Sequence, residues 1–167
     1  YPARLCELAR IAGYMHDIGN VSTRIDHAQS GAVMAFRILD KMGMDASEIA
    51  VICSAIGNHD ESTAYPVNEV AAALILADKT DVRRTRVRGK DRELFDIHDR
   101  VNYSVEKAAT RILAEQREIL LELHIDTEIS PIPDYFEIFM DRMLLCNKAA
   151  KRLQLNFRLE INGQKIL

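Results

Sequence analysis

Four stretches in the first half of the chain carry apolar residues at helical spacing, and this feature restricts the fold more than any other. In the first stretch, Leu5, Leu8, Ala12 and Met15 recur every three or four positions, which is typical of a helix with one buried face. The same spacing predicts three more helices, over residues 27–41, 45–57 and 69–88. We therefore expect a mainly α fold in which several helices pack around a core.

Residues that favour helix ends separate these stretches. Gly43 follows the second stretch as a stop, and Asp45 with Glu48 three positions later resembles a capping box that opens the third. Asn68 is placed to cap the fourth helix, which would carry Asp78 in its middle. The four helices thus bring histidines and carboxylates to their ends or inner faces.

The helical spacing breaks at residues 88–91, which read Arg-Gly-Lys-Asp, and this is the expected domain boundary. We predict a helical domain over residues 1–90 and a small α+β module with antiparallel strands over residues 91–167. Within the module, residues 101–116 stay unassigned, because their Ala, Leu and Glu favour a helix whereas their first residues alternate as in a strand.

The rest of the module shows one helix and two strands. Residues 121–125 alternate between apolar and polar, the two-residue period of a half-buried strand. Asp134 then caps a predicted helix. The apolar face of this helix comprises Phe136, Phe139, Met140, Met143 and Leu144. Residues 157–161 alternate again, and Asn162-Gly163 is a strong hairpin turn.

Composition narrows the class of protein. The 22 basic and 25 acidic residues give a formal charge of −3, which argues against an extended nucleic-acid-binding surface. The longest uncharged apolar run is far shorter than the roughly 20 residues of a membrane span, and no signal peptide is visible. Cys6, Cys53 and Cys146 each lie in an apolar stretch, so we expect buried, reduced thiols. These features predict a cytoplasmic protein.

Three histidines and two carboxylates are the candidate site residues. His16 and Asp17 are adjacent at the end of the first helix, His27 begins the second, and His59 follows the third. Asp78 lies in an otherwise apolar run, where a buried carboxylate needs a metal cation or a strong hydrogen-bond partner. A single histidine is more often structural than a ligand, so the prediction depends on the whole set.

Mixed imidazole and carboxylate ligands favour some metals over others. They suit Fe, Mn, Co or Zn better than Ca or Mg alone. Asp17 can bridge two ions, a common arrangement where two metals clamp the attacking and leaving oxygens of a phosphoryl group. We therefore predict one or two divalent transition-metal ions as cofactors, with Mg²⁺ as an alternative.

Four short motifs surround these residues. In chain order they are His16-Asp17-Ile18-Gly19, His27-Ala28-Gln29-Ser30-Gly31-Ala32, Asn58-His59-Asp60-Glu61 and Leu76-Ala77-Asp78-Lys79. Their order and spacing resemble the HD superfamily of metal-dependent phosphohydrolases, over about residues 1–90. The resemblance implies an HD-domain-like helical bundle with His16, Asp17, His27, His59 and Asp78 as metal ligands, Asp17 bridging.

The same resemblance bears on catalysis and substrate. We predict Asp17, Asp60 and Lys79 as catalytic residues, Asp60 also as a further ligand. The HD-GYP branch, which hydrolyses cyclic dinucleotides, has a second histidine in place of Asp60, and residues 64–66 match its Gly-Tyr-Pro only in part. The dinucleoside tetraphosphatase branch shares residues 77–79 and the single histidine, which favours a nucleotide substrate.

Two departures from the family pattern stand out. The family supplies another histidine from a preceding helix, and no residue before His16 can take that part. Asn20 stands where many members place a lysine. The chain also lacks an initiating methionine, so we expect that it begins inside a longer protein and that the N-terminal helix is missing.

A basic run follows the last motif. Residues 79–92 hold seven Lys and Arg against two Asp, a local charge of +5 (7 minus 2). Lys79, Arg83 and Arg84 are the predicted substrate-binding residues, because positions 79 and 83 share a helix face and guanidinium groups suit phosphate. The alternative is a solvated helix face that pairs with acidic neighbours.

These patterns together predict an enzyme, a metal-dependent phosphohydrolase. It would act as a phosphomonoesterase or phosphodiesterase on a nucleotide or related phosphorylated metabolite, through a metal-activated water. The alternative is a catalytically weak nucleotide-sensing or binding module. The unpaired edge of the C-terminal strands further predicts a homodimer.

Overall fold

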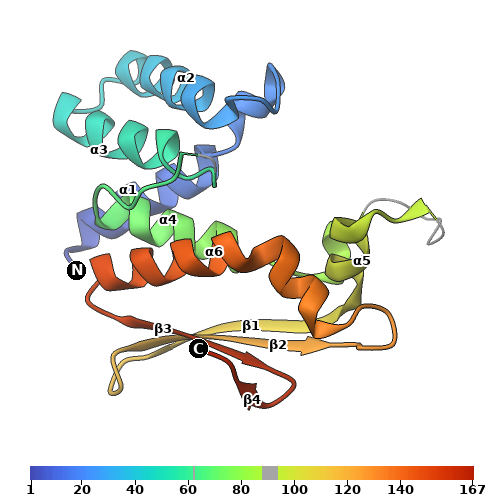
Figure 1. Cartoon of the computed structure of the whole chain (residues 1–167). Helices are drawn as coiled ribbons and strands as arrows, with labels where there is room; N and C mark the ends of the chain where they lie inside the picture. Colours follow the sequence, from blue (N-terminus) through green and yellow to red (C-terminus); the bar gives the residue numbers. More distant parts are fainter. Residues whose placement is uncertain (62, 88–93) are drawn as a thin grey trace. The chain divides into compact units, whose positions relative to one another are not determined.

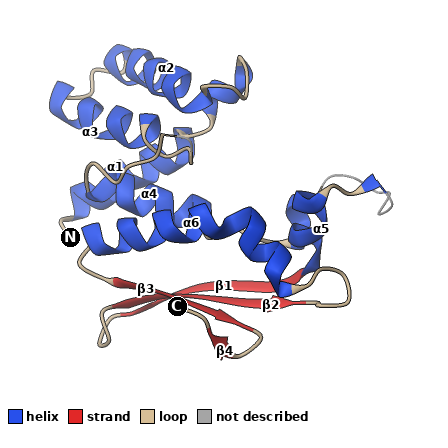
Figure 2. Ribbon diagram, in the orientation of Figure 1, coloured by secondary structure: helices blue, strands red, loops and turns tan. Residues whose placement is uncertain are grey.

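The computed structural model describes residues 1–61, 63–87 and 94–167. Within these ranges the chain forms six α-helices and one sheet of four strands (Figures 1 and 2). It divides into two compact units, Tyr1–Asp78 and Lys79–Leu167. The prediction of a mainly α fold followed by a small α+β module is therefore confirmed.

The structure does not describe the residues at the predicted limit between domains 1–90 and 91–167. The residues that were expected to mark this boundary, 88–91, lie outside the described ranges. The compact units meet earlier, between Asp78 and Lys79. The limits drawn from the sequence therefore stay a prediction.

The first unit consists of helices joined by short connections. Its elements are α1 (Ala3–Met15), the 3-10 turn η1 (Ile18–Val21), α2 (His27–Lys41), α3 (Ala46–Gly57) and all but the last residue of α4 (Glu69–Lys79). Asp45 caps α3 as predicted, because its side chain accepts a hydrogen bond from the backbone N–H of Ser47 at 2.8 Å. The carboxylate of Glu48 pairs with Arg4 across 44 positions of the chain instead of serving the cap.

Each of the four helices contributes a small residue to the core of the first unit, beside larger leucine, isoleucine, methionine and valine side chains. Ala12, Ala35, Ala55 and Ala71 are fully buried in one hydrophobic core, and each comes from a different helix. Side chains of this size let neighbouring helices approach closely. The ends of the four helices, where the candidate ligands lie, can therefore come together.

The fourth helix is shorter than predicted. α4 ends at Lys79 and not near residue 88, so Asp78 lies in its last turn and not in its middle. Residues 80–82 are Thr-Asp-Val, three types with low helix propensity, and Arg83 has an extended backbone with φ −162° and ψ 152°. Lys79 and Arg83 therefore do not share a helix face.

The second unit is built around the sheet. Its elements are η2 (Arg84–Arg86), α5 (Ile97–Ser104), β1 (Val105–Leu113), β2 (Glu118–Ile125), α6 (Ile132–Arg152), β3 (Asn156–Ile161) and β4 (Gln164–Lys165). The strand order is β1-β2-β3-β4, and α6 lies over one face of the sheet (Figure 2). The unassigned residues 101–116 begin with the end of α5 and continue as β1. The order is the reverse of the pattern, because the alternating first residues are mostly helical and most of the alanines that favour a helix lie in the strand.

The prediction that the strands of this unit are antiparallel was wrong for one of the three pairs. β1 pairs with β2 and β3 with β4 in antiparallel fashion, but β2 and β3 are parallel. The reason is that the long helix α6 connects β2 to β3 and returns the chain to the end where β2 began, as a parallel pair requires.

Helix α6 differs from the prediction in its start and in its buried face. It begins after Pro131, so Asp134 lies within the first turn and not at the cap. Met140 and Leu144, predicted to be part of the apolar face, are exposed. The buried side instead comprises Tyr135, Phe139, Met143, Leu145, Cys146, Ala149 and Ala150. The apolar stripe therefore begins one position earlier than the prediction, at Tyr135, and repeats every four residues at first.

The end of the chain follows the predicted hairpin. Asn162 and Gly163 have φ values of 51° and 77°, the left-handed conformations that a tight two-residue turn requires. β1 forms an outer strand of the sheet, and its Ile112 is 71% exposed. The homodimer predicted from such an edge stays a prediction, and a monomeric mass by light scattering would remove it.

Two expectations from composition can be compared with the structure. Cys146 is buried and burial raises the pKa of the half-buried Cys53 thiol, but Cys6 is exposed. The expectation for Cys6 was wrong because it lies two positions from the buried Leu8, which places it on the opposite side of α1. Among the helices of the described residues, none combines the length and the apolar character that crossing a bilayer demands.

Candidate metal centre

The five predicted ligands all lie at helix ends of the first unit. His16 is the C-cap residue of α1, and Asp17 follows it immediately before η1. His27 is the first residue of α2, His59 comes two residues after the end of α3, and Asp78 lies in the last turn of α4. Helix packing therefore brings together residues that span more than 60 positions of the chain.

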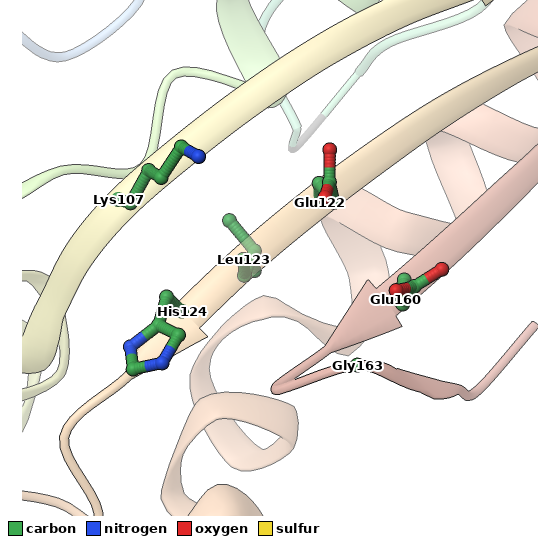
Figure 3. Close-up of a pocket in the computed structure, with 6 residues that line it drawn as sticks. All are labelled: Lys107, Glu122, Leu123, His124, Glu160 and Gly163. Atoms are coloured by element: carbon green, nitrogen blue, oxygen red, sulfur yellow. The ribbon is translucent and has the colours of Figure 1, made fainter.

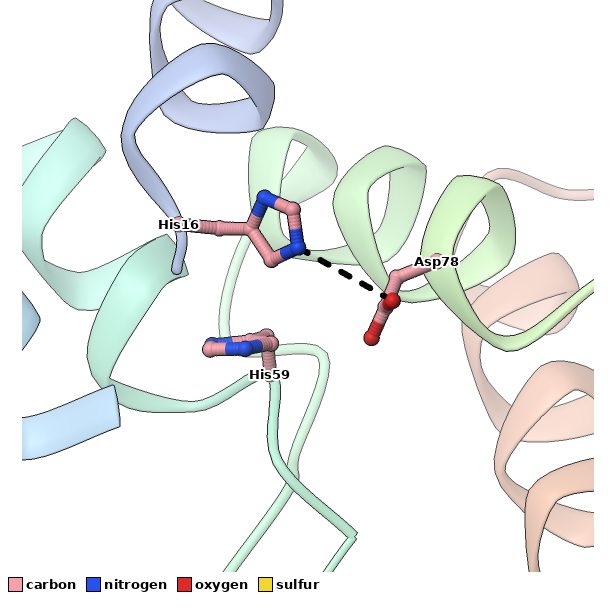
Figure 4. Close-up of side chains that lie close together, drawn as sticks. All are labelled: His16, His59 and Asp78. Atoms are coloured by element: carbon pink, nitrogen blue, oxygen red, sulfur yellow. Dashed lines mark ion pairs between the residues drawn. The ribbon is translucent and has the colours of Figure 1, made fainter. Parts of the chain in front are cut away.

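These residues form two groups of three that share His59. One group is His16, His59 and Asp78, which Figure 4 shows, and the other is Asp17, His27 and His59. In each group, one possible ligand atom per residue lies within 4.8 Å of the others. Two ligands with bonds of about 2.1 Å to one cation lie at most about 4.2 Å apart, so small side-chain movements bring either group to coordination distance.

Asp17 lies between the two groups. Its Oδ1 is 3.3 Å from Nε2 of His27 and 3.9 Å from Nε2 of His59, whereas its Oδ2 is 3.6 Å from Nε2 of His16. Nε2 of His16 is in turn 3.8 Å from Oδ1 of Asp78 (Figure 4). The two oxygens of one carboxylate thus face different histidines, which is the arrangement of a bridging ligand.

The three histidines are held in the same way. In each, Nδ1 lies close to the backbone carbonyl oxygen three residues earlier, at 2.8 Å for His16, 3.0 Å for His27 and 2.6 Å for His59. A carbonyl can only accept, so Nδ1 is the donor, and in the neutral form of the ring the lone pair is on Nε2. Such partners orient a ligating histidine and make it more basic. The Nδ1 contacts therefore leave all three Nε2 atoms available as cation ligands.

Sequence reasoning missed these carbonyl groups, although a signal for two of them exists. The acceptors for His16 and His59 are Gly13 and Ile56, which lie in the last turns of α1 and α3. The last four carbonyls of a helix have no partner within it, so a histidine just past the end can use one. The acceptor for His27, Arg24, lies in a connection and has no comparable signal.

Burial gives the centre an inner and an outer side. The side chains of His59 and His27 are 1% and 6% exposed, whereas that of Asp17 is 55% exposed. A buried imidazole can stay neutral, so the pair tolerates burial with or without a bound ion. Water and a ligand can therefore reach the centre from the side of Asp17.

The chemistry and spacing of this donor set fit a divalent metal ion. Three Nε2 atoms and two carboxylates combine the imidazole and oxygen ligands that transition metals accept. The set also carries two negative charges, from Asp17 and Asp78, which would compensate a divalent cation. We find no comparable group of three elsewhere in the described ranges.

Asp60 and Lys79, the other two predicted catalytic residues, are not among the residues of the two ligand groups. Asp60 is half-buried and belongs to neither ligand group among the described residues. Lys79, the first residue of the second unit, is only 5% exposed. The predicted catalytic roles of Asp60 and Lys79 stay predictions.

Arg83 and Arg84 already have partners inside the second unit. Nε of Arg83 is 2.8 Å from the carboxylate of Asp81. Arg84 donates from Nε to the backbone carbonyl of Tyr103 at 2.6 Å, and its guanidinium lies 4.5 Å from the centre of the Tyr103 ring. These contacts agree with the alternative of a basic surface that pairs locally, and the substrate-binding role of both residues stays a prediction.

A shallow pocket on the second unit is unrelated to these residues. Figure 3 shows its lining, which comprises Lys107, Glu122, Leu123, His124, Glu160 and Gly163. The side chain of His124 is exposed, and its Nδ1 is 3.2 Å from a carboxylate oxygen of Glu106. None of the predicted site residues contributes to this lining.

The first unit is thus a helical bundle in which the helix ends bring histidines and carboxylates together as a candidate cation site. Residues 6–83 match the family model of the HD domain. These residues therefore form an HD domain, a type of domain that is typically a metal-dependent hydrolase. Neither the curated proteins nor the solved structures gave a significant match to the chain. The branch of the family stays a prediction.

Proposed function

We propose that this chain acts as a metal-dependent phosphohydrolase on a nucleotide or a related phosphorylated metabolite. The observation that carries the proposal is the position of Asp17 between two ligand groups that share His59. This arrangement suits two cations held side by side by a common carboxylate. The HD domain over residues 6–83 supports the same class of chemistry.

The proposed ligands divide into two sets. His16, His59 and Asp78 would hold one divalent ion, and Asp17 with His27 a second, with His59 within reach of both positions. Fe, Mn, Co or Zn suits these donors best. When bound, such ions neutralise charge on a phosphoryl group and make a water molecule more acidic.

The chain's own residues have two tasks in this proposal. The buried imidazoles of His27 and His59, each held through Nδ1, keep their Nε2 atoms near the positions that a cation would need. The exposed side chain of Asp17 marks the side from which a phosphorylated ligand would enter. Asp60 and Lys79 are proposed to assist because they adjoin His59 and Asp78 in the chain.

Turnover with defined metal content tests the proposal. The protein is stripped with a chelator, reloaded with Mn²⁺, and assayed with bis(p-nitrophenyl) phosphate, p-nitrophenyl phosphate and a panel of nucleotides. His27→Gln and His124→Gln form a matched pair, since one histidine is in the site and the other is exposed on β2. We expect metal-dependent turnover that His27→Gln abolishes and His124→Gln leaves unchanged.

Other outcomes separate the alternatives. Nucleotide binding with no turnover by the Mn²⁺-loaded protein would support the sensing module in place of the enzyme. Absence of both metal binding and turnover would remove the proposal altogether. Equal losses in the two histidine variants would show that the measured activity does not arise at this site.

A further inference from the structure

Gly31 lies at the point where the ligand-bearing segments touch. It is one helical turn after His27 on α2. A Cβ atom placed on Gly31 would lie 3.3 Å from the backbone nitrogen of Gly19, 3.3 Å from the carbonyl oxygen of His16 and 3.5 Å from Cγ2 of Ile56. The first two distances are tighter than most contacts of real β-carbons, and both involve backbone atoms that cannot rotate away.

Each of these neighbours is tied to a ligand. The carbonyl oxygen belongs to His16 itself, and Gly19 is two residues after Asp17. Ile56 supplies the carbonyl that accepts the Nδ1 hydrogen bond of His59 at 2.6 Å. A Cβ atom on Gly31 would therefore press on the segment of His16 and Asp17 and on Ile56, which holds His59. Gly31 itself lies on the same helix as His27.

We propose that Gly31 is a positioning residue that sets the metal affinity of the centre by letting α2 approach the His16-Asp17 segment. The inference rests on the proposed function, because it assumes that the ligands hold a cation. An added methyl group would push the two segments apart by a few tenths of an ångström and lengthen the 3.3 Å separation between His27 Nε2 and Asp17 Oδ1. The side chains of both ligands would remain.

Two other glycines define the useful comparison. A Cβ on Gly19 would lie 2.0 Å from the carbonyl oxygen of His27, an overlap with backbone that the fold cannot absorb, so Gly19→Ala is unsuitable as a probe. A Cβ on Gly57, at the end of α3, would meet only the Cβ of Ala32, at an ordinary 3.6 Å. Gly57→Ala is therefore the matched control for Gly31→Ala, with the same chemical change in a helix.

Titration of the metal-free protein with Co²⁺, followed by its visible absorption bands, tests the inference. We expect Gly31→Ala to bind Co²⁺ between about 10- and 100-fold more weakly, the range found when the supports of metal ligands are altered. At saturation its bands should also shift in position or intensity, because the ligand geometry has changed. Gly57→Ala should match the unaltered protein in affinity and spectrum, and circular dichroism should show the same helix content in all three.

The possible results are distinguishable. If the unaltered protein binds no Co²⁺, the proposed function fails and this inference fails with it. If the unaltered protein binds Co²⁺ and Gly31→Ala matches its affinity and spectrum, only the inference is overturned. A weaker affinity with an unchanged saturated spectrum would also overturn it, since loss of folded protein alone gives that result. Should Gly31→Ala be too unstable to purify, the same titration is made in the Gly57→Ala background, whose alanine favours the helix.

Discussion

The two units of this chain bury different kinds of residue. In the first, a buried alanine from each of the four helices packs beside leucine and isoleucine side chains, and the fully buried side chains include the imidazole of His59. In the second, α6 and the sheet contribute large apolar side chains, among them Tyr135 and Phe139, which are each 1% exposed.

The difference shows what each unit has to achieve. Ligands at the ends of separate helices can share a cation only if the helices approach closely, and alanine and glycine contacts allow that approach. The second unit has a helix lying over a sheet, and large side chains fill the wider space between two such layers. The first unit should therefore be sensitive to added volume at its alanine and glycine contacts, and the second should be sensitive to lost volume at its large side chains.

The largest expected effect is on the second unit. Phe139→Ala should lower the free energy of unfolding by about 3–5 kcal/mol, because it removes a buried aromatic ring and leaves a cavity. Met140→Ala, the adjacent and 44% exposed position of α6, should change it by less than about 0.5 kcal/mol. Urea unfolding followed by circular dichroism measures both, and similar values for the two variants would contradict the described face of α6.

The next effect concerns the centre of the first unit. Asp17→Asn keeps the shape of the side chain but removes the charge that lies between the two ligand groups. We expect Co²⁺ affinity to fall at least about 100-fold, or about 2.7 kcal/mol, since altering mere supports of ligands already gives up to that factor. Asp40→Asn, on the exposed side of α2, is the control. Unchanged affinity in Asp17→Asn would exclude it as a ligand.

The third prediction compares added volume at a buried position and at an exposed position of α2. Ala35→Leu inserts a larger side chain where α2 is fully buried, and overpacking of this kind lowers the free energy of unfolding by about 1–3 kcal/mol. Val33→Leu adds a methylene on the exposed side of the same helix, at a position that is 66% exposed, and should be close to neutral. A neutral Ala35→Leu would mean that the helices are not tightly packed at that position.

The smallest effect is a pH dependence at the surface of the first unit. Hydrogen bonds from Ser47 lower the pKa of Asp45, and the bond from Arg4 lowers the pKa of Glu48. A carboxylate whose pKa is lowered by folding stabilises the native state above its ordinary pKa and loses that contribution as the pH falls through the lowered value. Thermal unfolding should therefore show a small loss of stability below about pH 4, and Glu48→Gln should reduce it. An identical pH profile in Glu48→Gln would contradict the contribution of this pair.

Much of the first unit was predictable from the sequence because its signals are local. The apolar spacing and the capping residues gave α2 at its observed limits and α3 with Asp45 as its cap. The motifs around His16 and Asp78 indicated the HD domain before any packing was known. α4 was predicted too long because the prediction followed the spacing of apolar residues alone. That spacing does not reflect the low helix propensity of residues 80–82, where the helix has ended.

The errors in the second unit have a different origin. Met140 and Leu144 fit a helical stripe as well as Tyr135 and Cys146 do, so the apolar pattern alone left the rotation of α6 open. The direction of β2 relative to β3 depends on where α6 returns the chain, which no single strand encodes. Contacts distant in the chain decided both.

The sequence by itself determined the helices, the donor types of the centre and the family of residues 6–83, because each depends on residue identity and short-range spacing. Only the tertiary structure decided which donors meet: that His59 belongs to two groups, that Asp17 lies between them, and that Gly31 touches the supporting segments. The physical reason is that these distances are set by how closely whole helices pack, and packing depends on all the side chains of the core together.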